Sequence, residues 1–196
     1  MPDHLSSQLL DSAALVSKQR HNNMAAIHSK GTKPEMVVRR WLWSKGFRYR
    51  LNSSRLPGHP DLVLKRYRTC IFVNGCFWHG HKLRVAQNEE LKVKSEELVY
   101  DFVSSECCKI PKTNREFWVN KIRRNQERDA EERQKLKEMG WHCITIWECE
   151  LKPKVRQQTL TALEYTLNHI FLQDHAQHYE IVEETMPMAA EEKWSN

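Results

Sequence analysis

The segment from Thr69 to His81 constrains the fold more than any other part of this sequence. Its first five residues, Thr69–Val73, are rich in β-branched and aromatic side chains and predict a buried strand. Asn74-Gly75 is a turn signal that ends this strand. The side chains that follow are Cys76, Phe77, Trp78, His79 and His81. The turn therefore brings a thiol, two imidazoles and two large aromatic rings to one edge of the predicted sheet, where we expect a site for chemistry or binding.

A second short strand is predicted just before the first. It starts at Asp61, after the turn-rich segment Leu56–Pro60, and ends at Leu64. Only Lys65–Arg68 separates the two strands, which favours an antiparallel hairpin. In such a hairpin Asp61 lies near the Val73–His81 turn. A carboxylate beside a backbone carbonyl and an imidazole suits a hydrolytic metal site.

The remaining elements follow from capping signals and apolar spacing. Two predicted capping boxes, Thr32–Glu35 and Thr113–Glu116, start helices that end at Gly46 and Gly140. The other elements, in chain order, are a strand over Phe47–Leu51, a buried strand over Trp141–Trp147 and a helix over Gln158–Phe171. The order α-β-β-β-α-β-α predicts an α/β fold with a mixed central sheet flanked by helices.

Four motifs carry a resemblance to a known family. They are Pro57-Gly58-x-Pro60-Asp61, Gly75-Cys76-Phe77-Trp78-His79-x-His81, Pro111–Trp118, and Gly140-Trp141 with Trp147-Glu148-Cys149. In this order they resemble the very-short-patch repair (Vsr) mismatch endonucleases, over about residues 17–172. The resemblance implies a restriction-endonuclease-like fold with a structural zinc site. It also implies an enzyme that uses Mg²⁺ to nick DNA beside the thymine of a T:G mismatch, which arises from deaminated 5-methylcytosine, and a functional link to a cytosine-5 DNA methyltransferase.

The length of 196 residues fits one domain with tails. We expect a mobile N-terminal extension over residues 1–16, a Vsr-like domain over 17–173 and an acidic tail over 174–196. The family has few residues where this chain has 82–106, so that stretch reads as an insertion; apolar spacing that includes Phe102 and Val103 predicts a short helix in it. No membrane span or signal peptide is visible, so we expect a cytoplasmic protein. The resemblance implies a bacterial enzyme, which we expect to be a monomer and to associate with the nucleoid when it is bound to DNA.

Charge is distributed unevenly along the chain. The net charge is +6 and the isoelectric point is about 9.0. Between Ser17 and Arg50, nine basic residues face one acid, whereas six acids face one lysine between Asp174 and Asn196. A basic body with an acidic end favours a polyanionic partner, with double-stranded DNA as the leading candidate. The alternative is a solvated basic face without a nucleic-acid role.

Six cysteines in a reducing compartment favour metal ligands or core thiols over disulfides. The Cys76-x4-His81 pair offers two zinc ligands, and Cys149 ends the last predicted strand. The resemblance places these three residues on ligand positions of the family. The remaining family position is occupied by Leu83 here, so we expect Cys107 or Cys108 to supply the fourth ligand, with Cys108 preferred. Cys70 and Cys143 lie inside predicted strands and read as core residues.

Phosphodiester hydrolysis needs a base, a cation and protonation of the leaving oxygen. Asp61 suits Mg²⁺, and the resemblance adds the backbone carbonyl of Val73 as a second metal contact. The resemblance also makes His79 the general base, and an imidazole titrates near neutrality. The alternative for His79 is a neighbour of the zinc site.

Three further residues belong to this catalytic prediction. Glu35 matches a helix acid near the metals in the family, but as the last residue of a capping box it has a purely structural alternative. Asp129 matches a family acid that orients a histidine. Asn74 stands where the family commonly has histidine; it can donate a hydrogen bond but cannot act as an acid near pH 7.

Aromatic residues predict contact with unstacked bases. Apolar wedges separate a mismatched base step more easily than a paired one. The resemblance favours intercalation by Phe77, Trp78 and Trp118, with Met24 from the basic N-terminal arm. The structural alternative is a set of aromatic side chains buried beneath the zinc turn.

Three functions compete at this point. The first is a mismatch-directed, Mg²⁺-dependent strand-nicking endonuclease. The second is a zinc-containing module that binds distorted DNA without cutting it, because Asn74 has replaced a histidine. The third is a restriction-type nuclease acting on intact duplex. Asp61 and His79 argue against the second, and the aromatic wedge argues against the third.

Overall fold

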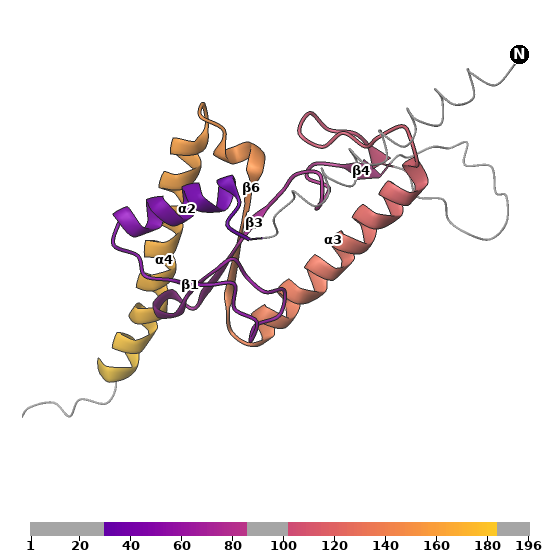
Figure 1. Ribbon diagram of the computed structural model, residues 1–196. Coiled ribbons are helices and arrows are strands. Elements are labelled where there is room, and N and C mark those ends of the chain that lie inside the picture. The colour runs from indigo at the N-terminus through magenta and orange to yellow at the C-terminus, as the bar shows by residue number, and fades with distance from the viewer. Residues whose placement is uncertain (1–29, 86–101, 184–196) are drawn as a thin grey trace, which may run out of the picture.

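A four-stranded mixed sheet forms the centre of the molecule (Figure 1). The computed structural model describes residues 30–85 and 102–183, and the strands occur in the order β1-β2-β3-β6. They comprise β1 (Arg50–Leu51), β2 (Leu62–Leu64), β3 (Thr69–Asn74) and β6 (His142–Trp147). β1–β2 and β2–β3 are antiparallel, whereas β3–β6 is parallel. The expected hairpin is confirmed, with Leu62 opposite Ile71.

Helices cover both faces of this sheet, as Figure 1 shows. α2 (Lys33–Ser44) and α4 (Arg156–Glu183) lie on one side, and α3 (Arg115–Glu138) lies on the other. Alternating side chains of β2 and β3 divide between the two cores. The core between the sheet and the α2–α4 side includes Leu62, Leu64, Ile71, Val38, Leu42, Leu160, Leu163 and Leu167. The core between the sheet and α3 contains Val63, Cys70, Phe72 and Leu136. The predicted α/β sheet with flanking helices is confirmed; its likeness to restriction endonucleases stays a prediction.

The two predicted capping boxes have different outcomes. At α2, Thr32 Oγ1 accepts a hydrogen bond from the amide of Glu35 (3.3 Å), as expected. The Glu35 carboxylate, however, accepts from the amide of Gly31 (2.6 Å) rather than from that of Thr32. At α3 the predicted box is wrong, because the residue before the helix is Asn114 in a left-handed conformation (φ 52°) with no side-chain cap. A capping side chain needs an extended backbone at that position.

Three other elements differ from the sequence prediction. Phe102 and Val103 form strand β5, antiparallel to β4 (Arg84–Val85), and not a helix. β6 lies at an edge of the described sheet, so only its Ile146 is buried. α4 continues through Glu183, beyond the expected helix end at Phe171 and into the stretch read as an acidic tail. The predicted N-terminal extension, Met24 and most of the insertion (86–101) lie outside the described residues, and the domain boundaries stay predictions.

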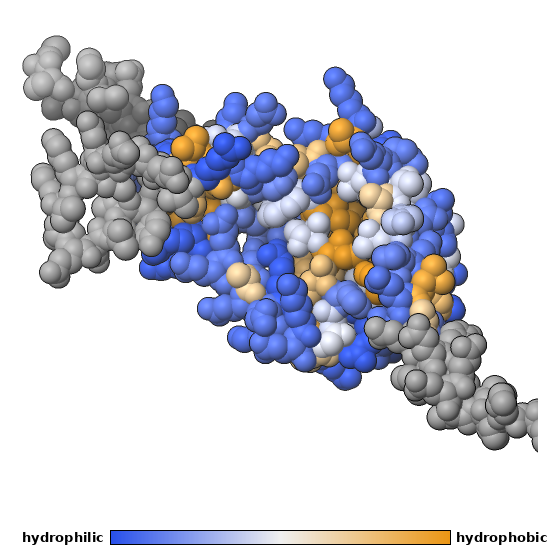
Figure 2. Space-filling view, turned by 180° about the vertical axis from the view of Figure 1, so that it is seen from behind, coloured by the Kyte–Doolittle hydropathy of each residue, from blue (hydrophilic) through white to orange (hydrophobic). Residues whose placement is uncertain are grey.

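The visible surface is mainly hydrophilic (Figure 2). On that face apolar residues gather in one central band and a few isolated positions. None of the helices in the described ranges is both long and apolar enough to cross a membrane.

Candidate active site and metal centre

A cavity of about 350 Å³ lies where β3 ends and the 75–82 turn begins. Five of the predicted catalytic and metal-binding residues line it: Asp61, Val73, Asn74, His79 and Asp129. The sequence predicted the first four to be close, because they lie on one hairpin and its turn. Asp129 comes from α3, on the other side of the sheet edge. One cavity therefore holds a carboxylate, an imidazole and a second carboxylate that contacts the imidazole.

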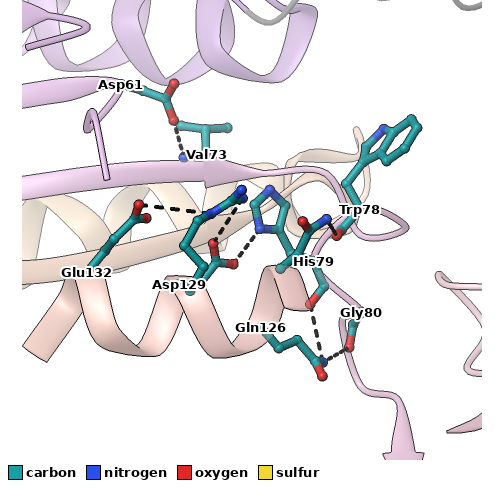
Figure 3. A network of polar contacts seen from close by, with 10 residues as sticks. Asp61, Val73, Trp78, His79, Gly80, Gln126, Asp129 and Glu132 are labelled. Carbon is teal, nitrogen blue, oxygen red and sulfur yellow. Dashed lines mark hydrogen bonds and ion pairs between the residues drawn. The ribbon is translucent and has the colours of Figure 1, made fainter. Parts of the chain in front are cut away.

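Asp61 immediately precedes β2 and points toward β3 (Figure 3). Its Oδ2 accepts a hydrogen bond from the amide of Val73 at 2.7 Å. Burial raises the pKa of Asp61, the amide of Val73 opposes that rise, and the negative charge of Glu35 adds to it. The ionised carboxylate is thus disfavoured in the protein alone. A bound cation would reverse this by offsetting the charge.

His79 is oriented by α3. Its Nδ1 lies 2.5 Å from Oδ2 of Asp129. An Nδ1–H donated to this carboxylate fixes the tautomer and leaves Nε2 with its lone pair. In Figure 3 that second nitrogen points away from Asp129. The geometry suits a proton acceptor in the cavity and separates His79 from the cysteine cluster, contrary to its alternative role as a zinc neighbour.

Two amides of α3 hold the loop that carries His79. Asn125 Nδ2 donates to the carbonyl of Trp78 (2.7 Å). Gln126 Nε2 donates to the carbonyls of Gly80 (3.2 Å) and His79 (3.4 Å), as drawn in Figure 3. The sequence analysis missed both residues. The spacing of Asn125 and Asp129, four residues apart on one helix face, is the signal that would have indicated a shared role.

Gly80 packs directly against this helix. A Cβ at Gly80 would lie 2.6 Å from both Gln126 Nε2 and Ile122 Cγ2, and its φ is +62°. Gly80→Ala is therefore expected to destabilise the protein by about 2–4 kcal/mol through overpacking and backbone strain, which thermal unfolding measures. Gly46→Ala is the matched control, because its φ is +84° but no atom lies within 4 Å of the added Cβ. Equal losses in the two variants would contradict the packing argument.

A second cluster lies at the far side of the same turn. Cys76, His81, Cys107 and Cys149 place their ligand atoms within 4.8 Å of one another. The sulfurs of Cys76, Cys107 and Cys149 are 3.6, 3.4 and 3.3 Å from His81 Nδ1. The ring of Trp147 stacks on His81, with centroids 4.1 Å apart and 7° between the planes. The imidazole is thus held in one orientation toward three thiols.

The preferred assignment of Cys108 to this cluster is wrong, and its alternative Cys107 takes the position. Ser105 Oγ accepts a hydrogen bond from the amide of Cys108 (3.1 Å) and closes a tight turn. This turn leaves Cys107 facing His81. The Cys108 side chain is fully buried instead, with its sulfur 3.8 Å from the carbonyl of Phe77.

The cluster fits a structural metal ion. Zinc bonds of about 2.3 Å to sulfur and about 2.0–2.1 Å to nitrogen give a tetrahedral edge of about 3.5 Å. The three sulfur–nitrogen distances of 3.3–3.6 Å match that edge. Burial raises the pKa of Cys76 to about 12, so its thiolate needs a cation nearby. Three thiols and one imidazole form a donor set that supplies this need when a metal binds.

Aromatic rings gather beside the cavity. Phe77 lies 5.2 Å from Trp78 and 5.2 Å from Trp118, between ring centroids. All three are half-buried, so neither the wedge nor the buried alternative follows from burial alone. The sequence analysis missed Phe117, which is 60% exposed and contacts Trp118 at 5.1 Å. We refer to Phe77, Trp78, Phe117 and Trp118 as the aromatic cluster.

Glu35 lies close to the cavity without lining it. It is buried, and Gly31 and Arg39 contact its two oxygens. Its charge nevertheless raises the pKa of Asp61. Glu35 thus has a structural role at the start of α2, through the amide of Gly31 and not that of Thr32, and it also acts electrostatically on Asp61.

Comparisons with known proteins show which family this chain is similar to. The family model for the DNA mismatch endonuclease Vsr matches residues 13–85. The nicking enzyme V.NmeAIP of Neisseria meningitidis is 42% identical over 131 residues, which cover 67% of this chain and 78% of that protein. The nicking enzyme V.XorIIP of Xanthomonas oryzae is 35% identical over 156 residues, covering 80% and 94%. The DNA mismatch endonuclease Vsr of Escherichia coli is 35% identical over 144 residues, covering 72% and 78%.

This chain belongs to the Vsr family. The segment that matches the Vsr family model contains Asp61, His79 and two residues of the cysteine–histidine cluster, Cys76 and His81. Three further site residues lie beyond that segment. Cys107 follows β5, Asp129 lies on α3 and Cys149 follows β6, and all three contact residues of the same turn.

Proposed function

We propose that this Vsr-family protein nicks one strand of duplex DNA beside the thymine of a T:G mismatch and so starts very-short-patch repair. The observation that carries the proposal is the His79–Asp129 pair in one cavity with Asp61, next to the aromatic cluster. The His79–Asp129 pair and Asp61 suit phosphodiester hydrolysis. The aromatic cluster suits recognition of an unstacked base step. The relatives named as nicking and mismatch enzymes support the same reaction.

His79 would act as the general base. Nε2 takes a proton from the attacking water, while Asp129 stabilises the imidazolium that forms. The water oxygen forms a bond to phosphorus, the bond from phosphorus to the leaving sugar oxygen breaks, and that oxygen takes up a proton from solvent. Asn74 lines the same cavity and would donate a hydrogen bond to the substrate.

Asp61 and the carbonyl of Val73 would hold Mg²⁺. The carboxylate and the carbonyl are oxygen ligands of the type Mg²⁺ prefers. The burial that raises the pKa of Asp61 disfavours its negative charge, and a bound cation would offset that charge. When bound, Mg²⁺ supplies that charge to the phosphate in the transition state. Glu35 would strengthen the negative potential that attracts the cation.

We also propose zinc as the ion of the Cys76–His81–Cys107–Cys149 cluster, in a structural role. All four positions are taken by protein ligands, which is typical of structural rather than catalytic zinc. The bound zinc would fix the turn that carries His79 between two of its ligands. The predicted monomer, the cytoplasmic location and the link to a cytosine-5 methyltransferase extend this proposal.

The aromatic cluster, with Met24, would enter the duplex at the mismatch. Trp118→Ala is expected to weaken binding to a T:G duplex by about 1–3 kcal/mol, the usual loss per base stacked on an aromatic ring, and to lower the preference for T:G over T:A. Filter binding with both duplexes measures this. Trp43→Ala is the control, since Trp43 is an exposed tryptophan of α2 outside the cluster. Unchanged discrimination by Trp118→Ala would contradict intercalation.

A nicking assay tests the proposal directly. T:G and T:A duplexes are incubated with the protein, with and without Mg²⁺, and the strands are separated. We expect one nick in the T:G duplex, only with Mg²⁺. Binding without cleavage would instead support the DNA-binding module, and equal cleavage of T:A would support the restriction-type nuclease.

A further inference from the structure

The catalytic cavity contains a cation that the mechanism above does not use. Arg133 lines the cavity together with Asp61, Val73 and His79. It lies four residues after Asp129 on α3, so the two side chains project from the same helix face. Its guanidinium carbon is 5.9 Å from the ring centroid of Phe72, which also lines the cavity.

Arg133 has unused hydrogen-bonding capacity. Its Nε is buried and has no hydrogen-bond partner, and no carboxylate among residues 30–84 and 102–176, whose side chains the structure describes, lies at ion-pair distance from its guanidinium. A guanidinium offers five donors in a planar fork that matches phosphate oxygens. A buried donor without a partner is unfavourable, so this arrangement favours a ligand that supplies an acceptor.

Arg128 shows the contrast within the same cavity. Its guanidinium nitrogens lie 3.9 Å from Asp129 Oδ1 and 3.9 Å from Glu132 Oε1, and the side chain is more than half exposed. Its charge is therefore balanced by two carboxylates of the protein. The cavity walls carry three carboxylates, Asp61, Asp129 and Glu132, and Arg133 is the arginine there without such a partner among the described residues.

We propose that Arg133 is a catalytic residue that binds a non-bridging oxygen of the phosphate being cleaved. This inference rests on the proposed nicking activity. As the water oxygen bonds to phosphorus and the leaving oxygen departs, negative charge on the non-bridging oxygens must be stabilised. The neutral Asn74 contributes no charge to this task, whereas Arg133 donates charge-assisted hydrogen bonds to those oxygens. Arg133 takes up no proton and forms no covalent bond in the step.

The test compares single-turnover nicking and binding for wild type, Arg133→Met, Arg133→Lys and Lys135→Ala on a T:G duplex with Mg²⁺. Methionine keeps the stem that packs over Phe72, so lost packing is not confounded with lost charge, and thermal unfolding checks each variant. Lys135 is an exposed cation of the same helix outside the cavity and serves as the matched control. Removing one transition-state donor typically costs about 10²–10³-fold in rate.

We expect Arg133→Met to lose that rate while its affinity for the duplex falls less than about tenfold. Arg133→Lys should recover part of the rate, and guanidinium ion at sub-denaturing concentration should accelerate Arg133→Met but not Lys135→Ala. Nicking by Arg133→Met within threefold of the wild-type rate would overturn the inference and leave the proposed function intact. A loss of affinity that accounts for the whole rate loss would also overturn it, because Arg133 would then be an ordinary backbone contact. A wild-type protein that does not nick would overturn the proposed function itself.

Discussion

Asp61→Asn is expected to lower the rate of T:G nicking by about 10³-fold or more and to leave the protein folded. The carboxylate is the charged Mg²⁺ ligand that we propose for the cavity, and a metal ion contributes several kcal/mol of transition-state stabilisation. Asparagine retains an oxygen that can accept the amide hydrogen of Val73, so the β2–β3 contact survives. A nicking time course at saturating duplex measures the loss, with filter binding to show that the DNA is still held.

The same variant is expected to be at least as stable as the wild type when no Mg²⁺ is added. Burial raises the pKa of Asp61 in the folded state. Folding therefore favours the protonated acid, and stability falls as pH rises from the ordinary aspartate pKa of about 4 to the raised folded value. Above that value the full penalty is present, and asparagine removes it. The variant should thus unfold at an equal or higher temperature near neutral pH, and the difference should vanish below about pH 4.

Two outcomes would contradict this account separately. Nicking at the wild-type rate by Asp61→Asn would place the metal site elsewhere. A lower unfolding temperature for the variant at neutral pH would show that the Asp61 carboxylate stabilises the metal-free fold, contrary to its raised pKa.

Removal of the cluster's metal is expected to have the largest effect on stability. Structural zinc sites contribute about 10–16 kcal/mol of apparent binding free energy in small peptides at pH 7, which is comparable to the whole stability of a domain, about 5–15 kcal/mol. The four ligands join the turn after β3, the segment after β5 and the short 3-10 helix (Glu148–Leu151) after β6, so their release frees three separate parts of the chain. A strong chelator or Cys149→Ser should therefore lower the unfolding temperature sharply and expose thiols.

Two neighbouring cysteines provide the control. Metal analysis of the purified protein should return about one zinc per chain, as expected for one four-ligand site. Cys107→Ser should lose this zinc, whereas Cys108→Ser should keep it, because the Cys108 side chain points into the core and not toward His81. The opposite result would identify Cys108 as the fourth ligand. A protein that is folded without metal would contradict the zinc assignment.

The sequence alone determined the parts of the site that depend on short-range geometry. The strand–loop–strand pattern from Asp61 to Asn74 placed Asp61 beside Val73, because a four-residue connection leaves few alternatives to a hairpin. The Asn74-Gly75 break fixed where the turn begins, and it set Cys76 and His81 at a spacing typical of metal ligands. The alternation along β2 and β3 likewise determined which side chains enter each core, since successive residues of a strand point to opposite faces.

The tertiary structure alone decided the contacts between distant segments. Asp129 orients His79 because α3 packs along the sheet, and Asn125 and Gln126 hold the loop for the same reason. No local pattern distinguishes Cys107 from Cys108; the hydrogen bond between Ser105 and the amide of Cys108 does so, by setting which side chain faces His81. The same holds for two features that the sequence analysis did not predict. They are the left-handed backbone at Asn114 and the pairing of β4 with β5, and both depend on the path of the chain between β5 and α3. The hydrophobic periodicity of a sequence indicates the face of an element on which a residue lies, but tertiary packing determines which residues that face contacts.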